Sequence, residues 1–127
     1  MNSGKKYSIY IVEDNDLYAM ILEHNLKDSF LFNSTTFASG EDCINSLNNN
    51  PDLVILDYNL KGMNGLETLK QIKKIKPTLP VIVVSSQTDL QIALDLMSQG
   101  ADDYIEKNNN PIQKLVAAIE KIQAKKK

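Results

Sequence analysis

The 127-residue sequence contains no arginine, because all 14 of its basic residues are lysines. A planar guanidinium group grips phosphate or carboxylate through two parallel hydrogen bonds, so this chain cannot supply such a grip. Its net charge of −2 and its pI near 5.3 give no electrostatic reason to expect a polyanionic partner. We therefore expect neither direct nucleic-acid binding nor membrane association.

Cysteine, histidine and long apolar runs are also scarce. Cys43 is the only cysteine, which excludes an internal disulfide and suits a reducing compartment. His24 has no second histidine with which to share a metal, and its helical setting predicts a solvent-facing residue. The polar first six residues lack the apolar core of a signal peptide, and no run approaches the roughly 18 apolar residues of a membrane span. These absences predict a soluble cytoplasmic protein.

The sequence does contain a regular alternation of short β-rich segments with segments of helical spacing. The predicted strands are residues 7–12, 31–37, 53–56, 81–84 and 103–105. Alternating strands and helices predict an α/β fold, with a parallel sheet covered on both faces. Segments 53–56 and 81–84 are uninterrupted apolar runs, which is typical of central strands buried on both sides. We expect one domain with a core of about residues 7–122.

Apolar residues at helical spacing predict five helices. Pro111 suits the first turn of the last helix, Gly100 the end of the fourth, and Asp16 the cap of the first. The third is expected to end before Pro77, and the second, shorter helix follows Gly40. In chain order the predicted apolar stripes are Leu17, Met20, Ile21 and Leu26; Ile44 and Leu47; Leu66, Leu69, Ile72 and Lys73; Ile92, Ala93, Leu96 and Met97; and Ile112, Leu115, Val116, Ile119 and Ile122.

Polar residues follow the predicted strands at the edge where ligands bind in such sheets. Glu13 and Asp14 follow the first strand, Asp57 the third, Ser85 the fourth and Lys107 the fifth. Each residue alone has an ordinary structural explanation, since aspartate and serine commonly cap turns and most lysines are solvated. Their joint placement is what the ordinary explanations do not predict.

This set of residues suits magnesium-dependent phosphoryl transfer. Close carboxylates repel one another unless a cation neutralises them, and Mg²⁺, with Mn²⁺ as a substitute, prefers oxygen ligands. With a metal and Lys107 balancing the charge, the Asp57 carboxylate could attack phosphorus and form an acyl phosphate. Ser85 would donate its hydroxyl to a phosphoryl oxygen.

Five segments in order resemble the receiver domain of two-component response regulators, over roughly residues 7–122. The matching segments are Ile11-Val12-Glu13-Asp14, Leu53-Val54-Ile55-Leu56-Asp57, Leu60-Lys61-Gly62-Met63-Asn64-Gly65, Pro80-Val81-Ile82-Val83-Val84-Ser85 and Gly100-Ala101-Asp102-Asp103-Tyr104-Ile105-Glu106-Lys107. The resemblance implies a flavodoxin-like (βα)5 sandwich of three layers with strand order 2-1-3-4-5.

The resemblance also implies residue roles. Asp57 would accept a phosphoryl group from a histidine kinase or phosphotransfer protein, with Lys107 binding the phosphate. The metal would be held by Glu13, Asp14, Asp57 and the main-chain carbonyl of Asn59, with Asp14 the more direct ligand of the acidic pair. The hydroxyl of Ser85 and the aromatic ring of Tyr104 would form a conformational switch. The side chains of Asn59 and Gln87 would set the lifetime of the phosphate on Asp57.

Phosphorylation would shift an existing equilibrium and be reported by a surface around residues 90–99, 103–105 and 112–123. The chain would act as a monomer or a phosphorylation-dependent dimer that binds an output protein or domain. It would not be a turnover enzyme, although it would catalyse its own phosphorylation and slow dephosphorylation. Whether it stands alone or belongs to a longer regulator stays open.

The chain departs from the family pattern after Lys107, where Asn108 stands in place of a proline usually joined by a cis bond. Ser85 replaces the commoner threonine.

Three other functions are alternatives to that of a signalling phosphoryl acceptor. A dehalogenase-like phosphatase normally has a second aspartate two residues after the nucleophile, where this chain has Asn59. A flavodoxin-like electron carrier would be repelled by the acidic loop after the first strand, and a phosphorylation-independent interaction module is the remaining alternative.

Overall fold

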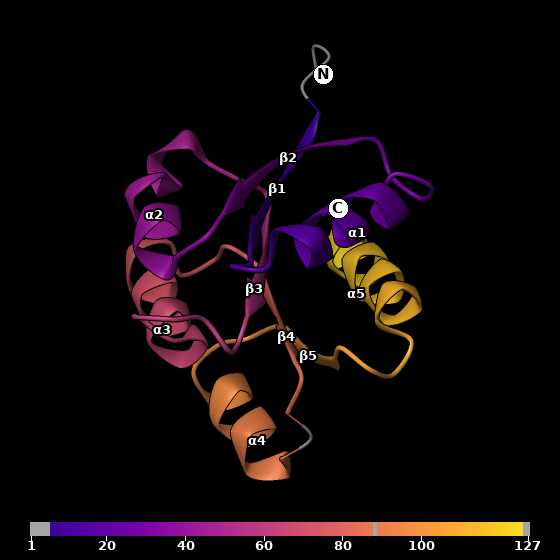
Figure 1. Cartoon of the computed structure of the whole chain (residues 1–127). Helices are drawn as coiled ribbons and strands as arrows, with labels where there is room; N and C mark the ends of the chain where they lie inside the picture. Colours follow the sequence, from indigo (N-terminus) through magenta and orange to yellow (C-terminus); the bar gives the residue numbers. More distant parts are fainter. Residues whose placement is uncertain (1–5, 88, 126–127) are drawn as a thin grey trace.

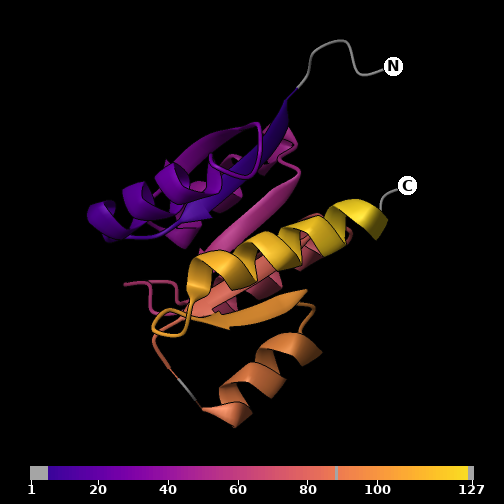
Figure 2. The ribbon, with the colours of Figure 1, turned by 90° about the vertical axis from the view of Figure 1, so that its right-hand side faces the viewer.

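The structure is a computed structural model that describes residues 6–87 and 89–125. In chain order the elements are β1 (Tyr7–Val12), α1 (Asp16–Leu26), β2 (Phe32–Phe37), α2 (Gly40–Asn45), a 3₁₀ turn (Leu47–Asn49), β3 (Leu53–Asp57), α3 (Gly65–Ile75), β4 (Val81–Ser85), α4 (Leu90–Ser98), β5 (Asp103–Glu106) and α5 (Pro111–Lys125). Helices lie on both sides of one sheet, with α1 and α5 on one side and α2 and α3 on the other (Figure 1). The side view shows α5 lying along the sheet (Figure 2).

The five strands are parallel and follow the order β2-β1-β3-β4-β5. This confirms the predicted α/β class and the flavodoxin-like strand order. The register pairs Val12 with Leu56, Asp57 with Val84, and Ser85 with Glu106. The carboxyl ends of β1, β3, β4 and β5 therefore meet at one edge of the sheet. β3 and β4 are each one residue longer than predicted, so Asp57 and Ser85 belong to the strands.

The sheet divides the interior into two hydrophobic clusters. Alternate residues of β1 and β3, such as Ile9 and Leu53, pack with α1 and α5, whereas Tyr10 and Val54 pack with α2 and α3. All five residues of β3 and all five of β4 are buried, as expected for central strands covered on both faces. The carboxyl edge of the sheet is thus built on strands that are buried along their whole length.

The predicted apolar stripe of the first helix is wrong at three of its four positions. Leu17, Met20 and Ile21 are 67%, 65% and 43% exposed, whereas α1 buries Ala19, Leu22 and the fourth predicted residue, Leu26, against the sheet. The predicted cap is also one residue off, because the Asn15 side chain accepts from the Tyr18 amide while Asp16 lies in the first turn. Asparagine and aspartate cap equally well, so propensity does not separate them.

Smaller corrections concern the other elements. Leu31 lies outside β2 and is 85% exposed. The second helix ends at Asn45, and Leu47 is buried from the 3₁₀ turn that follows. Only Leu96 of the predicted α4 stripe is fully buried, and Met97 is 44% exposed. The α5 stripe is confirmed as the face that packs on the sheet, and Gly100 ends α4 with a φ of +105° that favours glycine.

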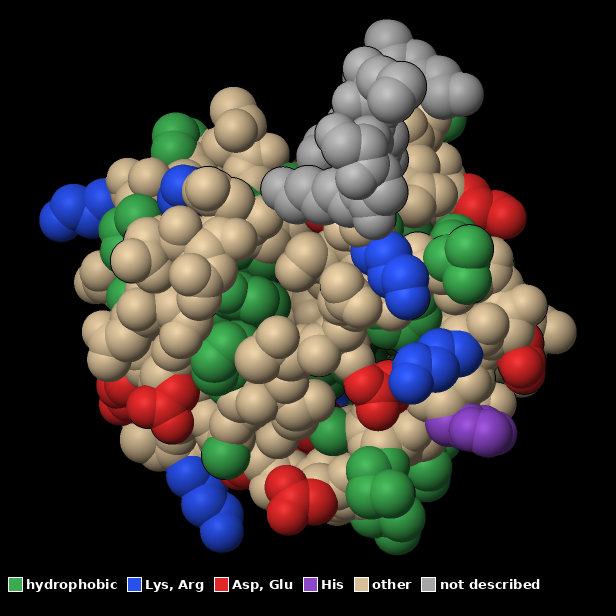
Figure 3. All heavy atoms as spheres, turned by 90° about the horizontal axis from the view of Figure 1, so that it is seen from above, with side chains coloured by type: hydrophobic (Ala, Val, Ile, Leu, Met, Phe, Trp, Pro, Cys, Tyr) green, Lys and Arg blue, Asp and Glu red, His purple; other side chains and the backbone are tan. Residues whose placement is uncertain are grey.

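The face of the molecule shown in Figure 3 carries all kinds of side chain. On the visible part of the face in Figure 3, acidic and basic groups are interspersed and hydrophobic groups also reach the surface. His24 is exposed on α1, as predicted. Within the described part of the chain, no helix has the length and apolarity needed to cross a membrane.

Candidate phosphoacceptor and metal site

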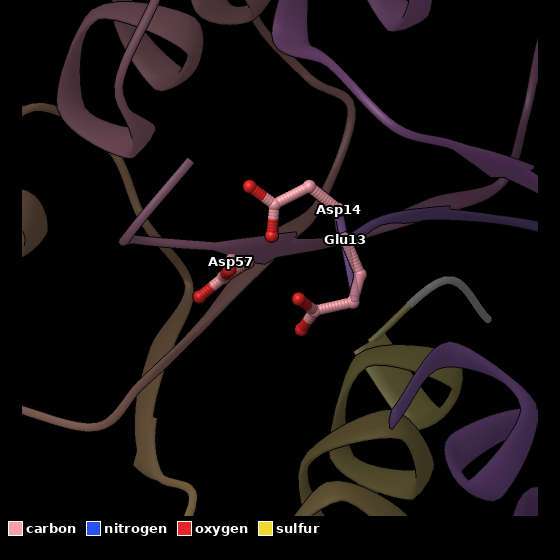
Figure 4. Close-up of side chains that lie close together, drawn as sticks. All are labelled: Glu13, Asp14 and Asp57. Atoms are coloured by element: carbon pink, nitrogen blue, oxygen red, sulfur yellow. The ribbon is translucent and has the colours of Figure 1, made fainter. Parts of the chain in front are cut away.

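Three carboxylates from two neighbouring strands converge at the carboxyl edge of the sheet. Glu13 and Asp14 follow β1, and Asp57 is the last residue of β3 (Figure 4). The backbone still continues the sheet at Glu13, whose amide donates to the Phe37 carbonyl at 2.9 Å. Glu13 and Asp57 are only 2% and 4% exposed, while Asp14 is more open. The predicted acidic set is therefore brought together.

One carboxylate oxygen from each of Glu13, Asp14 and Asp57 lies within 4.8 Å of the other two. Hard divalent cations such as Mg²⁺ and Ca²⁺ take oxygen ligands, and Mg²⁺ keeps several of its waters. Two buried acids with a third at the solvent side give a cation both ligands and room for water. The residues present thus fit a small, hydrated, oxygen-preferring cation.

Lys107 enters this site from the loop after β5. Its Nζ lies 2.9 Å from Glu13 Oε1 and 3.3 Å from Asp57 Oδ1, and its amide donates to the Ser85 carbonyl at 2.8 Å. The lysine is thereby held both at its backbone and at its ammonium group. It neutralises part of the charge that the buried acids would otherwise hold unpaired.

Protonation of this pair follows from its surroundings. Burial raises the pKa of the Glu13 carboxyl, the charge of Asp57 raises it further, and the hydrogen bond from Lys107 opposes both. For Lys107, burial alone would lower the pKa, but the hydrogen bond to Glu13 and the charges of Asp57 and Glu13 outweigh it and raise the pKa. Lys107 therefore stays a cation at neutral pH.

The predicted switch residues are joined through the backbone of Gln87. Ser85 is fully buried, and its Oγ accepts from the Gln87 amide at 2.9 Å. The Tyr104 hydroxyl donates to the Gln87 carbonyl at 2.6 Å. One peptide segment of the β4–α4 loop thus connects a hydroxyl at the site to an aromatic side chain on the edge strand.

Asn59 and Gly65 shape the surroundings of Asp57 on the β3–α3 side. The Asn59 amide donates to Asp57 Oδ1 at 3.2 Å, and its exposed side chain accepts from Ser86 Oγ at 3.2 Å. A Cβ on Gly65 would lie 2.5 Å from the Tyr58 Cα and 2.9 Å from the Asp57 carbonyl oxygen. Only glycine therefore lets α3 begin so close to the end of the strand that carries Asp57.

Sequence reasoning missed two residues that complete the site. Asn15 donates its amide to Glu13 Oε2 at 3.1 Å and caps the helix that carries Tyr18. The Lys107 Nζ lies 4.4 Å from the centroid of the Tyr18 ring. An aromatic residue three positions after a helix cap carries no sequence signal for such a contact.

The peptide bond between Lys107 and Asn108 is trans, because the described residues contain no cis peptide bond. This loop therefore differs from the cis turn that is usual in the family that the chain resembles.

Comparison with known proteins identifies the family. Residues 9–120 match the family model described as "Response regulator receiver domain". The chain is 32% identical over 119 residues to the glycerol metabolism activator of Pseudomonas putida, covering 91% of this chain and 53% of that protein. It is 36% identical over 114 residues to the DNA-binding transcriptional regulator NtrC of Escherichia coli K12, covering 89% of this chain and 24% of that protein.

A solved structure gives the same result. A response regulator from Chloroflexus aurantiacus superimposes with a TM-score of 0.85 at 31% identity, over 94% of this chain and 99% of that one. The chain spans about half or less of the length of the two curated relatives, 53% and 24%. The chain belongs to the response regulator receiver domains, which are signalling switches and not turnover enzymes.

Proposed function

We propose that this chain accepts a phosphoryl group on Asp57, in a Mg²⁺-dependent reaction, from a histidine kinase or phosphotransfer protein. The observation that carries the proposal is the convergence of Glu13, Asp14 and Asp57, with oxygens within 4.8 Å, beside a lysine paired to two of them. Two buried acids that repel each other cost stability beyond what one lysine offsets, and a bound cation would remove that cost.

The acids would hold the metal, and Asn59 would add its main-chain carbonyl. A bound Mg²⁺, or Mn²⁺ in its place, would neutralise charge on the transferred phosphoryl group. Because Glu13 is nearly fully buried and Asp14 more open, we expect Asp14 to be the more direct ligand and Glu13 to act through water.

Asp57 is the nucleophile of the proposed transfer. A bond forms between an Asp57 carboxylate oxygen and phosphorus while the P–N bond of the donor's phosphohistidine breaks. The electron pair of that bond stays on the nitrogen, which leaves as neutral imidazole when the other ring nitrogen is protonated. Lys107 and the Ser85 hydroxyl then hold phosphoryl oxygens. Asn59 and Gln87 flank the path of the water that later hydrolyses the acyl phosphate, and so tune its lifetime.

The switch would run from Ser85 through Gln87 to Tyr104. Rotation of the Ser85 side chain toward a phosphoryl oxygen would break the hydrogen bond that its Oγ accepts from the Gln87 amide, and the carbonyl of the same residue accepts from Tyr104. Phosphorylation would thereby bias the α4-β5-α5 face, where Leu90 and Leu94 are 72% and 53% exposed. An output protein or domain would bind there, and the chain would act in the cytoplasm as a monomer or a phosphorylation-dependent dimer.

Intact mass measurement after incubation with acetyl phosphate and Mg²⁺ tests the proposal. We expect one added phosphoryl group, which hydroxylamine removes, and no adduct with EDTA or in Asp57→Asn. A chain that binds Mg²⁺ yet takes no phosphoryl group from acetyl phosphate or a phosphorylated histidine protein would instead be a phosphorylation-independent interaction module.

A further inference from the structure

We propose that Tyr18 is a positioning residue for Lys107. The Tyr18 ring holds the Lys107 ammonium group at the point where phosphoryl oxygens on Asp57 must be bound. The expected effect on phosphorylation rests on the proposed function, whereas the contact between Tyr18 and Lys107 is present in the unphosphorylated chain. The proposal assigns a role in the site to the first turn of α1, which sequence reasoning treated only as a helix start.

Lys107 has three partners, which lie on α1, in the β1–α1 loop and at the end of β3. Its Nζ lies 4.4 Å from the Tyr18 ring centroid, 2.9 Å from Glu13 Oε1 and 3.3 Å from Asp57 Oδ1. The two carboxylates pair directly with the ammonium group, and the ring face attracts its positive charge through the ring quadrupole. The ammonium group is therefore enclosed by two acids and a π face.

The ring is itself fixed relative to the acids. The Asn15 side chain accepts from the Tyr18 amide at 3.1 Å, and the Asn15 amide donates to Glu13 Oε2 at 3.1 Å. Tyr18 also packs against the hydrophobic cluster between the sheet and the α1 and α5 helices. The same cap thus sets where both the ring and the Glu13 carboxylate stand.

The two carboxylates cannot keep Lys107 in place once chemistry begins. Phosphorylation changes the charge and shape of Asp57, and a bound cation competes with Lys107 for Glu13. The ring is uncharged and binds neither metal nor phosphate, so its hold on the ammonium group persists throughout. A cation–π contact of this kind corresponds to a roughly 2- to 30-fold preference for the held position.

The Tyr18 hydroxyl contributes nothing to this role. It is buried and has no hydrogen-bond partner among the described residues. Phenylalanine would keep the ring face without burying that hydroxyl, so Tyr18→Phe should preserve the contact with Lys107 and should not reduce stability. This makes Tyr18→Phe the matched control for variants that alter the ring face.

The test replaces Tyr18 in the full chain with phenylalanine and with increasingly fluorinated phenylalanines, which weaken the ring quadrupole at nearly constant shape. We expect the second-order rate of phosphorylation by acetyl phosphate to match wild type for phenylalanine and to fall stepwise, by about 2- to 30-fold in total, with fluorination. An unchanged rate across the series would overturn the proposal.

A second measurement needs no phosphorylation. In NMR spectra, the Lys107 ε-methylene signal should be shifted upfield by the ring in wild type and Tyr18→Phe, and should return toward the ordinary value in Tyr18→Leu and Tyr18→Met. A wild-type chain that shows the shifted signal but takes no phosphoryl group would refute the proposed function alone. A wild-type chain that is phosphorylated but shows no shift would refute the role of Tyr18.

Discussion

Each edge of the sheet holds a lysine paired with an acid, one carboxylate at the amino edge and two at the carboxyl edge, and the two arrangements differ in which other groups satisfy the acids. At the amino edge, Lys73 lies 3.3 Å from Asp102 and also donates to the Leu79 carbonyl at 2.6 Å. At the carboxyl edge, Lys107 lies between Glu13 and Asp57. The residue types are the same at the two edges, so composition alone does not separate a structural cluster from a reactive one.

The backbone makes the difference. Strands begin with amide groups facing outward, and Asp102 accepts from the Val81 amide at 2.8 Å while Asp52 accepts from the Ser8 amide at 2.8 Å. At the carboxyl edge the strands end in carbonyls, which cannot donate to a carboxylate. Among the described residues, the amides that donate to the acids there belong to loops, as those of Asn59 and Asn15 do. Acids at the carboxyl edge are therefore left facing one another and a lysine, which is the condition for binding a cation and a phosphoryl group.

The largest expected effect separates the two lysines. Lys107→Ala should slow phosphorylation by acetyl phosphate about 100-fold, because it removes a charged donor aimed at the developing charge. Lys73→Ala, the matched change at the other edge, should leave the rate within about twofold of wild type, because it removes no group that could reach the developing charge. Equal losses in the two variants would mean that the edges do not differ in function.

Mg²⁺ should stabilise the chain through the carboxyl edge alone. At a concentration 100 times its Kd, a ligand that binds only the folded state adds about 2.7 kcal/mol to the free energy of unfolding. Thermal unfolding with and without Mg²⁺ should show this gain in wild type and Asp102→Asn, and its loss in Asp57→Asn. A gain retained in Asp57→Asn would place the metal elsewhere.

Neutralising an acid should have opposite effects on stability at the two edges. Asp102→Asn should lower the free energy of unfolding by about 1–3 kcal/mol, because it weakens the acceptor of the Val81 amide and the partner of Lys73. Asp14→Asn, measured without metal, should be neutral or stabilising, because it relieves repulsion from Glu13 and Asp57. Urea unfolding of both variants measures the two effects, and a large loss in Asp14→Asn would contradict the comparison.

The core between the edges gives an effect that is absent at neutral pH and appears only at alkaline pH. Burial raises the pKa of the Cys43 thiol to about 12, above its ordinary value of 9.0. Well below pH 9 the thiol is protonated whether the chain is folded or not, so stability is unaffected. As the pH rises from 9 toward 12, only the unfolded chain loses the proton, and the free energy of unfolding should fall by about 1.4 kcal/mol per pH unit. In Cys43→Ala, the free energy of unfolding should lack this part of its decrease above pH 9. A thiol-labelling reagent at pH 8 should react with Cys43 only when the chain unfolds.

Much of the fold could be predicted from the sequence because burial of the central strands leaves a strong signal. The apolar runs of β3 and β4 and the single stripe of α5 each have one arrangement that buries them. The first helix could not be placed in this way. It carries apolar residues on two faces, and only packing decides that Leu22 is buried while Met20 is exposed.

The acidic cluster could be predicted for a related reason, since parallel strands bring their carboxyl ends to one edge. The contact of Tyr18 with Lys107 could not, because it depends on the path of a long side chain across the sheet end. The structural role of Asp102 was equally hidden. A sequence shows that aspartates precede and follow strands, but it does not show which backbone amide each one meets.

Mapping the phosphorylated residue tests the central claim most directly. Borohydride reduces an aspartyl phosphate to homoserine, which peptide mass spectrometry locates after treatment with acetyl phosphate and Mg²⁺. We expect homoserine at position 57 and none at the two amino-edge positions, 52 and 102. Homoserine at position 52 or 102 would contradict the assignment of Asp57 as the acceptor. The assignment would also be contradicted if a chain that carries the added phosphoryl group gave homoserine at none of the three positions.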